Sequence, residues 1–376
     1  MATPLDDYPY HQAPMFMDQV VSSDRNFYDR YYFNGFTRDG ETMIMSGFGV
    51  YPNLGVVDAF FCVRIGERQW TVRMSDAYDG ARDTKVGPFR IEVVEPLQTL
   101  RIVSDTDAEG IGVDITWHGA FPVVDEAPHQ WRNNGRLILD AQRFAQVGSW
   151  SGEIRVDGRT IELDPNEWTG TRDRSWGIRP VGESEPAGRW GEESDPNYGF
   201  WWTYLPFRFD DFTVVVIAQE DGAGLRTLND AVRVWAPDHE RGHELLGFPE
   251  FTYTYRSGTR EVERVEVTLR DRDGSPMTMV AESLGHIALN AGPGYGGDPD
   301  WGHGQWRGRN WVSGVEVNVT DPEVVGRHAF GVNDHVGRAV LTEADGTTHE
   351  GWGLLEHGCI GAHAPSGFAD FFSVAP

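Results

Sequence analysis

Six Asp-Gly pairs divide this sequence into short segments, and they limit what it can fold into more than any other feature. The pairs begin at Asp39, Asp79, Asp157, Asp221, Asp273 and Asp345. Asp-Gly between apolar or alternating runs is typical of tight β-hairpins, because both central residues of a type I′ turn need positive φ. Residues 152–156 and 160–163 flank one pair, and residues 262–269 and 277–281 flank another. The sequence therefore predicts a succession of antiparallel hairpins.

Strand candidates extend along the whole chain, whereas helix candidates are scarce. Many of them alternate apolar with polar residues, as half-buried antiparallel strands do. They cover residues 60–65, 69–74, 89–94, 100–103, 112–117, 137–147, 212–218, 251–255 and 312–319. Short strands joined by hairpins predict an all-β sandwich or barrel. Because 376 residues are too many for one compact antiparallel core, we expect two domains of similar size.

One segment stands out as a domain boundary. Residues 181–197 read VGESEPAGRWGEESDPN, which is rich in Gly, Pro, Ser and Glu and fits an exposed connection. We therefore expect an N-terminal β domain over 1–185, a linker over 186–198 and a C-terminal β domain over 199–376. A second Gly- and Pro-rich stretch, 290–308, is predicted to be a long loop, and such loops are either functional or mobile.

The charge balance narrows the range of partners. With 32 basic and 58 acidic residues the net charge is −26, which repels phosphate backbones and anionic lipids. The negative charge predicts that the protein has no nucleic-acid partner. No run of 18 apolar residues occurs, so we also expect no membrane insertion. The first twelve residues lack the features of a signal peptide, and Cys62 and Cys359 are too few for a disulfide framework. These features indicate a soluble cytoplasmic protein with reduced thiols, and they leave a homodimer open.

The most specific motif follows the hairpin at Asp157. Residues 170–180 read GTRDRSWGIRP, in which Asp173 lies three residues before the aromatic-Gly pair Trp176-Gly177. Further features agree with it along the chain: VGPFRIEVVEP at 86–96, Trp117-His118-Gly119, and an aromatic strand at 200–205. Together these residues resemble the AttH-like and carotenoid 1,2-hydratase superfamily.

The resemblance implies two lipocalin-like (calycin) domains in tandem, with a pocket between or within the barrels. Known activities in that superfamily include the hydration of isoprenoid double bonds and cyclising steps on apolar natural products. The resemblance also implies Asp173 as the motif acid. Carotenoid hydratases tend to place a His directly after this Asp, whereas this chain has Arg174. An Arg facing the same site favours the ionised carboxylate, which argues against Asp173 as a proton donor.

Hydration of an alkene needs a general acid, stabilisation of the cation, and a positioned water. A carboxyl group can serve as the acid only if burial keeps it protonated near neutral pH. Asp173 lies between Trp168 and Trp176, so we expect an apolar setting with ring faces that attract a cation. In the alternative interpretation Asp173 is structural and forms a salt bridge with Arg172, Arg174 or Arg179.

Two further residues are candidates for the catalytic partner. His118 ends a strand on the face opposite Trp117, where it could act as the base, orient water, or make a structural hydrogen bond. Asp58 lies within the apolar run YPNLGVVDAFF. An inward carboxyl needs a partner, so Asp58 is either a pocket acid or a paired core residue.

The substrate-binding candidates are mostly aromatic: Trp117, Trp176, Trp202, Tyr204 and His357. Trp202 and Tyr204 share one face of their strand, with core packing as the alternative. The histidines at 335, 349, 357 and 363 lack the short spacings of metal ligands, so no metal site is predicted. The dipeptide Glu356-His357 is placed at the edge of a pocket.

No phosphate loop, dinucleotide fingerprint or nucleophile elbow occurs, so no cofactor is expected. The predicted function is a cofactor-independent lyase or isomerase, most concretely a hydratase or dehydratase, acting on an apolar isoprenoid-like or polycyclic small molecule. Asp173 is the predicted proton-transfer group, with His118 or Asp58 as its partner. Two alternatives are a non-catalytic lipocalin-like carrier of a lipophilic molecule and an interaction protein that uses its acidic surface.

Overall fold

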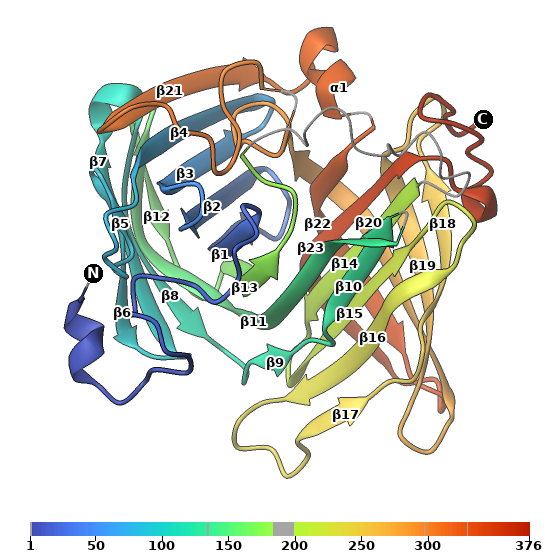
Figure 1. Ribbon diagram of the computed structural model, residues 1–376. Coiled ribbons are helices and arrows are strands. Elements are labelled where there is room, and N and C mark those ends of the chain that lie inside the picture. Colours follow the sequence, from blue (N-terminus) through green and yellow to red (C-terminus); the bar gives the residue numbers. More distant parts are fainter. Residues whose placement is uncertain (1, 134, 183–198, 297, 329) are drawn as a thin grey trace.

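Two curled antiparallel β-sheets lie side by side and form two barrel-like halves with very little helix (Figure 1). The computed structural model describes residues 2–133, 135–182, 199–296, 298–328 and 330–376. The prediction of an all-β protein with two tandem barrels is confirmed. The linker predicted over 186–198 lies outside the described residues, so the division into domains stays a prediction.

The first sheet has 14 strands and is built mainly from the N-terminal half. Its order is β21-β4-β3-β2-β1-β13-β11-β8-β7-β6-β5, and β9, β10 and β12 pair with β11. The strands are β1 (Phe27–Thr37), β2 (Thr42–Tyr51), β3 (Val56–Ile65), β4 (Arg68–Ala77), β5 (Lys85–Val86), β6 (Phe89–Glu95), β7 (Thr99–Thr106), β8 (Ile111–Gly119), β9 (Val124–Asp125), β10 (His129–Asn133), β11 (Arg136–Val156), β12 (Arg159–Leu163), β13 (Trp168–Ile178) and β21 (Trp311–Asn318). Two short 3-10 helices, η1 (Pro4–Asp7) and η2 (Asp107–Glu109), complete this half.

The second sheet has nine strands in the order β17-β16-β15-β14-β23-β22-β20-β19-β18. They are β14 (Gly199–Arg208), β15 (Phe212–Glu220), β16 (Arg226–Trp235), β17 (His243–Leu245), β18 (Glu250–Tyr255), β19 (Val262–Arg270), β20 (Pro276–Ile287), β22 (Val332–Thr342) and β23 (Thr348–Gly361). The helices here are α1 (Pro322–His328) and the 3-10 turn η4 (Ala364–Ser366).

The Asp-Gly pairs mark hairpins, but mostly not of the type that the sequence suggested. Only Asp157-Gly158 forms a two-residue turn with both φ angles positive, at 50° and 70°. In three others only the glycine is left-handed, with φ of 73° at Gly40, 86° at Gly274 and 88° at Gly346. The preceding Asp there accepts a backbone N–H two residues further on, an Asx turn that needs no positive φ. The other two pairs lie in loops, one after β4 and one between β15 and β16.

Alternation along the strands sends most buried apolar side chains of the described residues to three large cores. Inside the first barrel the rings of Trp117 and Trp150 meet edge to face, with centroids 5.2 Å apart. A second cluster, which includes Phe207 and Met279, fills part of the second barrel. A third packs the outer face of the first sheet against the second sheet, and Tyr32 and Trp202 belong to it. Successive residues of a strand point to opposite faces of the sheet. The same strand therefore contributes side chains both to a barrel interior and to the core between the two sheets.

The C-terminal half also contributes to the first sheet. Strand β21 pairs with β4, with Gly314 opposite Val72 (Figure 1). The chain reaches β21 through a segment between Ile287 and Trp311 that contains 290–308, the stretch predicted to be a long loop. This loop packs against the first barrel, where the buried Gln69 amide bonds the backbone of Ala288 and Ala291. The two halves therefore share a sheet as well as an interface.

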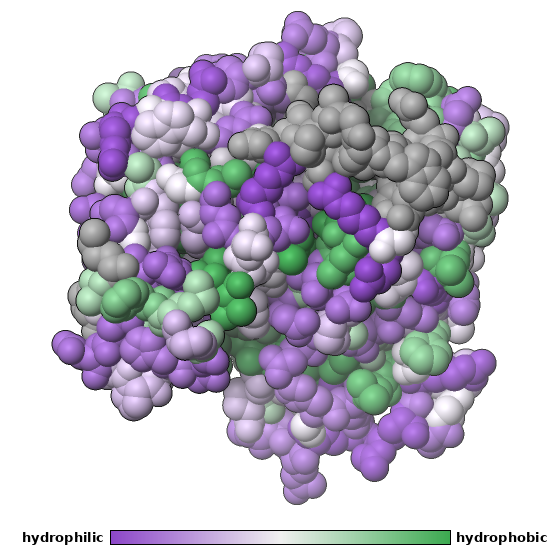
Figure 2. All heavy atoms as spheres, viewed as in Figure 1, coloured by the Kyte–Doolittle hydropathy of each residue, from purple (hydrophilic) through white to green (hydrophobic). Residues whose placement is uncertain are grey.

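The face of the molecule seen in Figure 2 is predominantly hydrophilic, and its apolar residues form separate patches. This agrees with a net charge of −26. Among the described residues, no helix has the length and apolar character needed to cross a membrane.

Candidate active site

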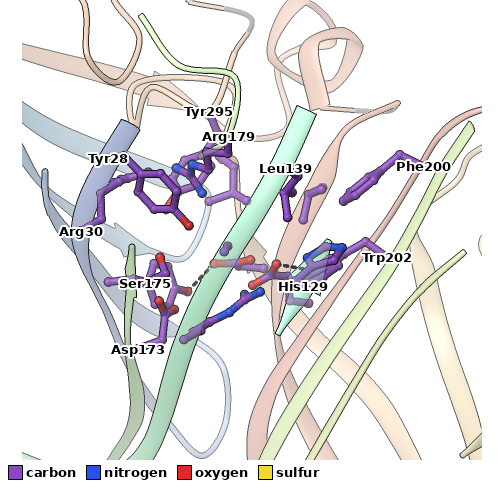
Figure 3. A pocket seen from close by; sticks show the side chains of 17 residues that line it. Tyr28, Arg30, His129, Leu139, Asp173, Ser175, Arg179, Phe200, Trp202 and Tyr295 are labelled. Carbon is purple, nitrogen blue, oxygen red and sulfur yellow. Dashed lines mark hydrogen bonds between the residues drawn. The ribbon is translucent and has the colours of Figure 1, made fainter. Parts of the chain in front are cut away.

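A cavity of about 190 Å³ lies between the two sheets (Figure 3). Its walls come from β1, β11 and β13 on one side and from β14, β22 and β23 on the other. The apolar part of the lining consists of Tyr28, Leu139, Ala141, Phe200, Trp202, Leu289 and Val332. A cavity of about 150 Å³ holds benzene, so this one accepts a small ring system.

Strand register sets the polar groups of the first wall in two rows. Asp173 on β13 lies between Tyr32 on β1 and Ala145 on β11. Ser175, one step further along the same face, lies between Arg30 and Arg143. The first wall therefore presents one carboxyl group and two guanidinium groups from neighbouring strands.

Two carboxylic acids face each other on the second wall. Asp334 on β22 is the direct cross-strand partner of Glu356 on β23, and Tyr204 on β14 follows in the same row. The hydroxyl of Tyr32 donates to Asp334 Oδ2 at 2.5 Å, and Trp202 Nε1 donates to Glu356 Oε1 at 2.5 Å (Figure 3). We call Asp334 and Glu356 the acid pair.

The acid pair is kept from ionising by its surroundings. Burial raises the pKa of Glu356 well above its ordinary value, and the charge of Asp334 raises it further. Burial also raises the pKa of Asp334, although its hydrogen bond from Tyr32 opposes the shift. Two adjacent carboxyl groups cannot both ionise cheaply in such a setting. The pair therefore carries at least one proton near neutral pH.

Asp173 lines the same cavity, and its catalytic role stays a prediction. Burial raises the pKa of its carboxyl group, while the nearby arginines, Arg143 first among them, oppose the shift. Among the described residues no basic nitrogen lies within 4.0 Å of it. Arg174, its sequence neighbour, points to the opposite face and pairs with Asp29 at 2.6 Å. The alternative of a structural salt bridge to Asp173 is thus not observed among the described residues.

Three groups around Trp202 complete the deep end of the cavity. His129 stacks on the Trp202 ring, and burial together with Arg143 lowers its pKa to about 4, so it is neutral at pH 7. Arg143 Nε lies 2.8 Å from Glu126 Oε2. Tyr204 is 1% exposed, and its hydroxyl has no hydrogen-bond partner among the described residues.

The other two predicted catalytic residues lie elsewhere. His118 is half-buried on the outside of β8, with Nε2 2.8 Å from Ser151 Oγ. Asp58 is buried and accepts hydrogen bonds from Gly304 N at 2.6 Å and the Tyr51 hydroxyl at 3.3 Å. Of its two predicted roles, the geometry matches the paired core residue, because Asp58 ties β3 to the long loop. Neither residue lines the cavity.

The predicted substrate-binding residues divide in the same way. Trp202 lines the cavity and Tyr204 lies beside it, whereas Trp117 is fully buried inside the first barrel. Trp176 is 38% exposed and does not line the cavity, because three positions along a strand separate it from Asp173 and turn it to the opposite face. His357 follows Glu356 and points away into the second barrel, 3.0 Å from the Tyr255 hydroxyl.

Sequence reasoning placed Glu356 only at the edge of a pocket and named Arg179 only as a structural partner of Asp173. It gave no role to Asp334, Arg30 or Arg143. One signal was available for Glu356, since an acid inside the apolar run GWGLLEHG needs a partner when its strand is buried. Asp334 gave no comparable signal, because its partner Tyr32 lies 302 residues away in the sequence. Among the described residues no cluster of three His, Cys, Asp or Glu side chains could hold a metal ion.

Comparison with solved structures places the fold. The chain is similar to an AttH-like protein from Nitrosomonas europaea, with 13% identity, a TM-score of 0.51, and coverage of 93% of this chain and 98% of that one. It is also similar to kievitone hydratase from Nectria haematococca (15% identity, TM-score 0.49, 87% and 88% covered) and to CghA (11%, 0.49, 92% and 95%). The resemblance seen in the sequence is confirmed at the level of the fold.

Comparison by sequence gives a family match but no close relative. The model of a family of unknown function, DUF8625, matches residues 2–369. No curated protein matches the chain significantly.

Proposed function

The chain belongs to the DUF8625 family, and from its AttH-like fold and acid pair we propose that it is a cofactor-independent hydratase or dehydratase acting on a small ring-bearing molecule. The observation that carries this proposal is the acid pair, Asp334 and Glu356, whose pKa values are both raised by burial at the wall of a cavity that aromatic and aliphatic side chains share with three arginines. A carboxylic acid that stays neutral at pH 7 is the group such a reaction needs as proton donor.

In the dehydrating direction, the acid pair donates its proton to a hydroxyl of the substrate as the carbon–oxygen bond breaks, and water leaves. Positive charge develops on the carbon, and the face of Trp202 stabilises it. Asp173, on the opposite wall, then accepts a proton from the adjacent carbon, and the double bond forms. Hydration is the reverse sequence, with Asp173 as the donor to carbon and the acid pair as the base for water.

Placing the two carboxyl sites on opposite walls suits this chemistry. Asp173 belongs to the first sheet and the acid pair to the second, so a substrate between the sheets meets one group on each face (Figure 3). The aromatic and aliphatic side chains of the lining strengthen the charge interactions beside them. Tyr32 connects the two sites, since it is the cross-strand partner of Asp173 and donates to Asp334.

The test uses conservative variants and a mass readout. The protein is incubated with a panel of one- and two-ring tertiary alcohols and their alkenes in H₂¹⁸O, and gain or loss of labelled water is followed by mass spectrometry. Glu356→Gln should lower turnover by about 100-fold or more, because it removes the proton while keeping the shape. Glu350→Gln, an exposed position on the same strand, is the matched control and should leave turnover unchanged.

The pH profile gives a second readout. In the dehydrating direction the acid pair must be protonated, so kcat/KM should fall as pH rises through its raised pKa. The Asp334→Asn variant should lose this alkaline limb together with most of its activity. A wild-type rate that rises steadily from pH 6 to 9 would contradict the assignment of the acid pair as donor.

A second cavity favours the carrier function as the alternative. The open end of the second barrel holds about 1130 Å³, lined by Trp201, Phe251, Tyr253, Tyr255 and Phe368 among others. Large aromatic surfaces around such a volume suit a lipophilic ligand. A protein that binds the panel compounds but turns none of them over, with binding retained in Glu356→Gln, would be a carrier.

A further inference from the structure

Three arginines line the cavity between the sheets, and a hydrocarbon substrate does not require any of them. Arg30 comes from β1, Arg143 from β11, and Arg179 follows the end of β13. Figure 3 shows Arg30 and Arg179 close to Tyr28 and Tyr295 on the first wall. A guanidinium group stays charged at every accessible pH, so these side chains place fixed positive charge beside an apolar space.

Only one of the three has a carboxylate within ion-pair distance among the described residues, and the charges of Asp58 and Asp173 stabilise Arg30 from further away. Arg143 lies within ion-pair distance of Glu126. Arg30 and Arg179 have no carboxylate oxygen within 4.0 Å among the described residues. Arg179 instead lies over the Tyr28 ring, with its guanidinium carbon 4.8 Å from the centroid.

The hydrogen-bonding groups of Arg30 point to a missing acceptor. Its side chain is 4% exposed, and its Nε has no partner among the described residues. Its Nη2 lies 3.4 Å from His303 Nε2, but that nitrogen is 2.7 Å from the Pro293 carbonyl oxygen. A carbonyl oxygen only accepts, so His303 Nε2 carries the hydrogen and cannot also accept one from Arg30. Buried donors of a charged group without an acceptor are costly, which makes a ligand oxygen the natural partner.

The carboxyl groups of the cavity do not supply the missing negative charge in full. Burial raises the pKa of Asp173, of both members of the acid pair, and of Glu126, whose value rises to about 7. Protonation of any of these groups removes a negative charge from the cavity, while the three arginines keep their positive charge. The remaining lining is aromatic and aliphatic.

We propose that Arg30 and Arg179 form an anion subsite in this cavity, and that the substrate carries an acidic oxygen, such as a carboxylate, phenolate or enolate, attached to its ring system. This inference rests on the proposed function for the identity of the cavity as the active site. The apolar lining beside the arginines selects an organic anion over inorganic phosphate. An oxygen held there would fix the orientation of the ring toward the acid pair on the opposite wall.

The test compares a charged probe with its neutral isostere. Isothermal titration calorimetry measures the binding of 2-naphthoate and of 2-naphthamide to the full chain, with inorganic phosphate as a third probe. We expect naphthoate to bind about tenfold or more tightly than naphthamide, because charge-assisted hydrogen bonds to the arginines are available only to the anion. Phosphate should bind more weakly than naphthoate, since it gains nothing from the apolar walls.

Variants assign the effect to the subsite. Arg179→Met, at a half-buried position, should remove most of the preference for naphthoate while leaving the affinity for naphthamide unchanged. Arg30→Lys retains the charge of the buried site and should weaken naphthoate binding by losing the paired donors. Arg338→Met, at an exposed arginine paired with Glu350, is the control and should bind both probes as the parent does.

Two results would overturn the anion subsite. In the first, naphthoate binds no more tightly than naphthamide, or neither compound binds. In the second, the Arg179→Met variant keeps the full preference for naphthoate. Failure of the proposed function gives a different pattern. In that case the naphthoate preference is present, while Glu356→Gln turns over the panel compounds as well as the parent does.

Discussion

The buried carboxyl group of Asp58 provides a quantitative test of how the first barrel is joined to the long loop. Burial raises its pKa from 3.8 to about 6, with Arg30 and the Gly304 N–H opposing the shift. Because the folded pKa is the higher one, the folded state binds the proton more tightly than the unfolded state, and stability falls as pH rises from 3.8 to 6. The resulting penalty is about 1.5 kcal/mol at pH 5 and about 3 kcal/mol at pH 8.

Asp58→Asn removes this penalty and keeps both hydrogen bonds. The Asn carbonyl oxygen can accept from Gly304 N, and its amide can donate to the Tyr51 hydroxyl, where Asp58 now makes its two contacts. We expect the free energy of unfolding of the variant, relative to wild type, to rise by about 1.5 kcal/mol between pH 5 and pH 8. Urea unfolding followed by tryptophan fluorescence at four pH values measures this difference. If this difference is flat or falls with pH, the folded protein stabilises the ionised form of Asp58 at least as well as the unfolded chain does, and the reasoning is refuted.

Two further predictions concern packing. Trp150→Ala should lower the free energy of unfolding by about 3–5 kcal/mol, because the ring is fully buried in the first barrel. Trp176→Ala should change the free energy of unfolding by less than about 0.5 kcal/mol. Thermal denaturation of both variants tests this contrast. Gly314→Val should destabilise the pairing of β21 with β4 by about 1–3 kcal/mol, because a Cβ at this position lies 2.3 Å from the Glu109 carbonyl oxygen. Faster amide hydrogen exchange confined to β4 and β21 would show that the pairing of these strands is weakened. Unchanged exchange would contradict the close contact between residue 314 and the Glu109 carbonyl oxygen.

Local signals in the sequence predicted the elements of the fold, and long-range pairing was beyond them. The hairpin at Asp157-Gly158 depends on two residues and their neighbours, so its strands could be placed within a few positions. The pairing of β21 with β4 joins Gly314 to Val72, and nothing in either strand specifies the other. Both are short apolar-alternating runs that would fit many edges of a sheet.

Local sequence signals likewise predicted only part of the candidate site. Asp173 could be selected because a local motif surrounds it, and alternation put Trp202 and Tyr204 on one face. Alternation cannot say which of two faces meets the other sheet. Trp117 was therefore expected at the pocket although it fills a barrel interior, and Asp334, whose importance comes from its neighbour Glu356 on another strand, was not selected.

The shared strand between the halves also has a consequence during synthesis. A ribosome adds about 5–20 residues each second, so on the order of tens of seconds separate the emergence of β4 from that of β21. Throughout that interval the edge of β4 exposes backbone donors and acceptors that a neighbouring nascent chain could occupy. Until β21 is made, the N-terminal barrel therefore lacks only its last strand and keeps one edge open to pairing with another chain.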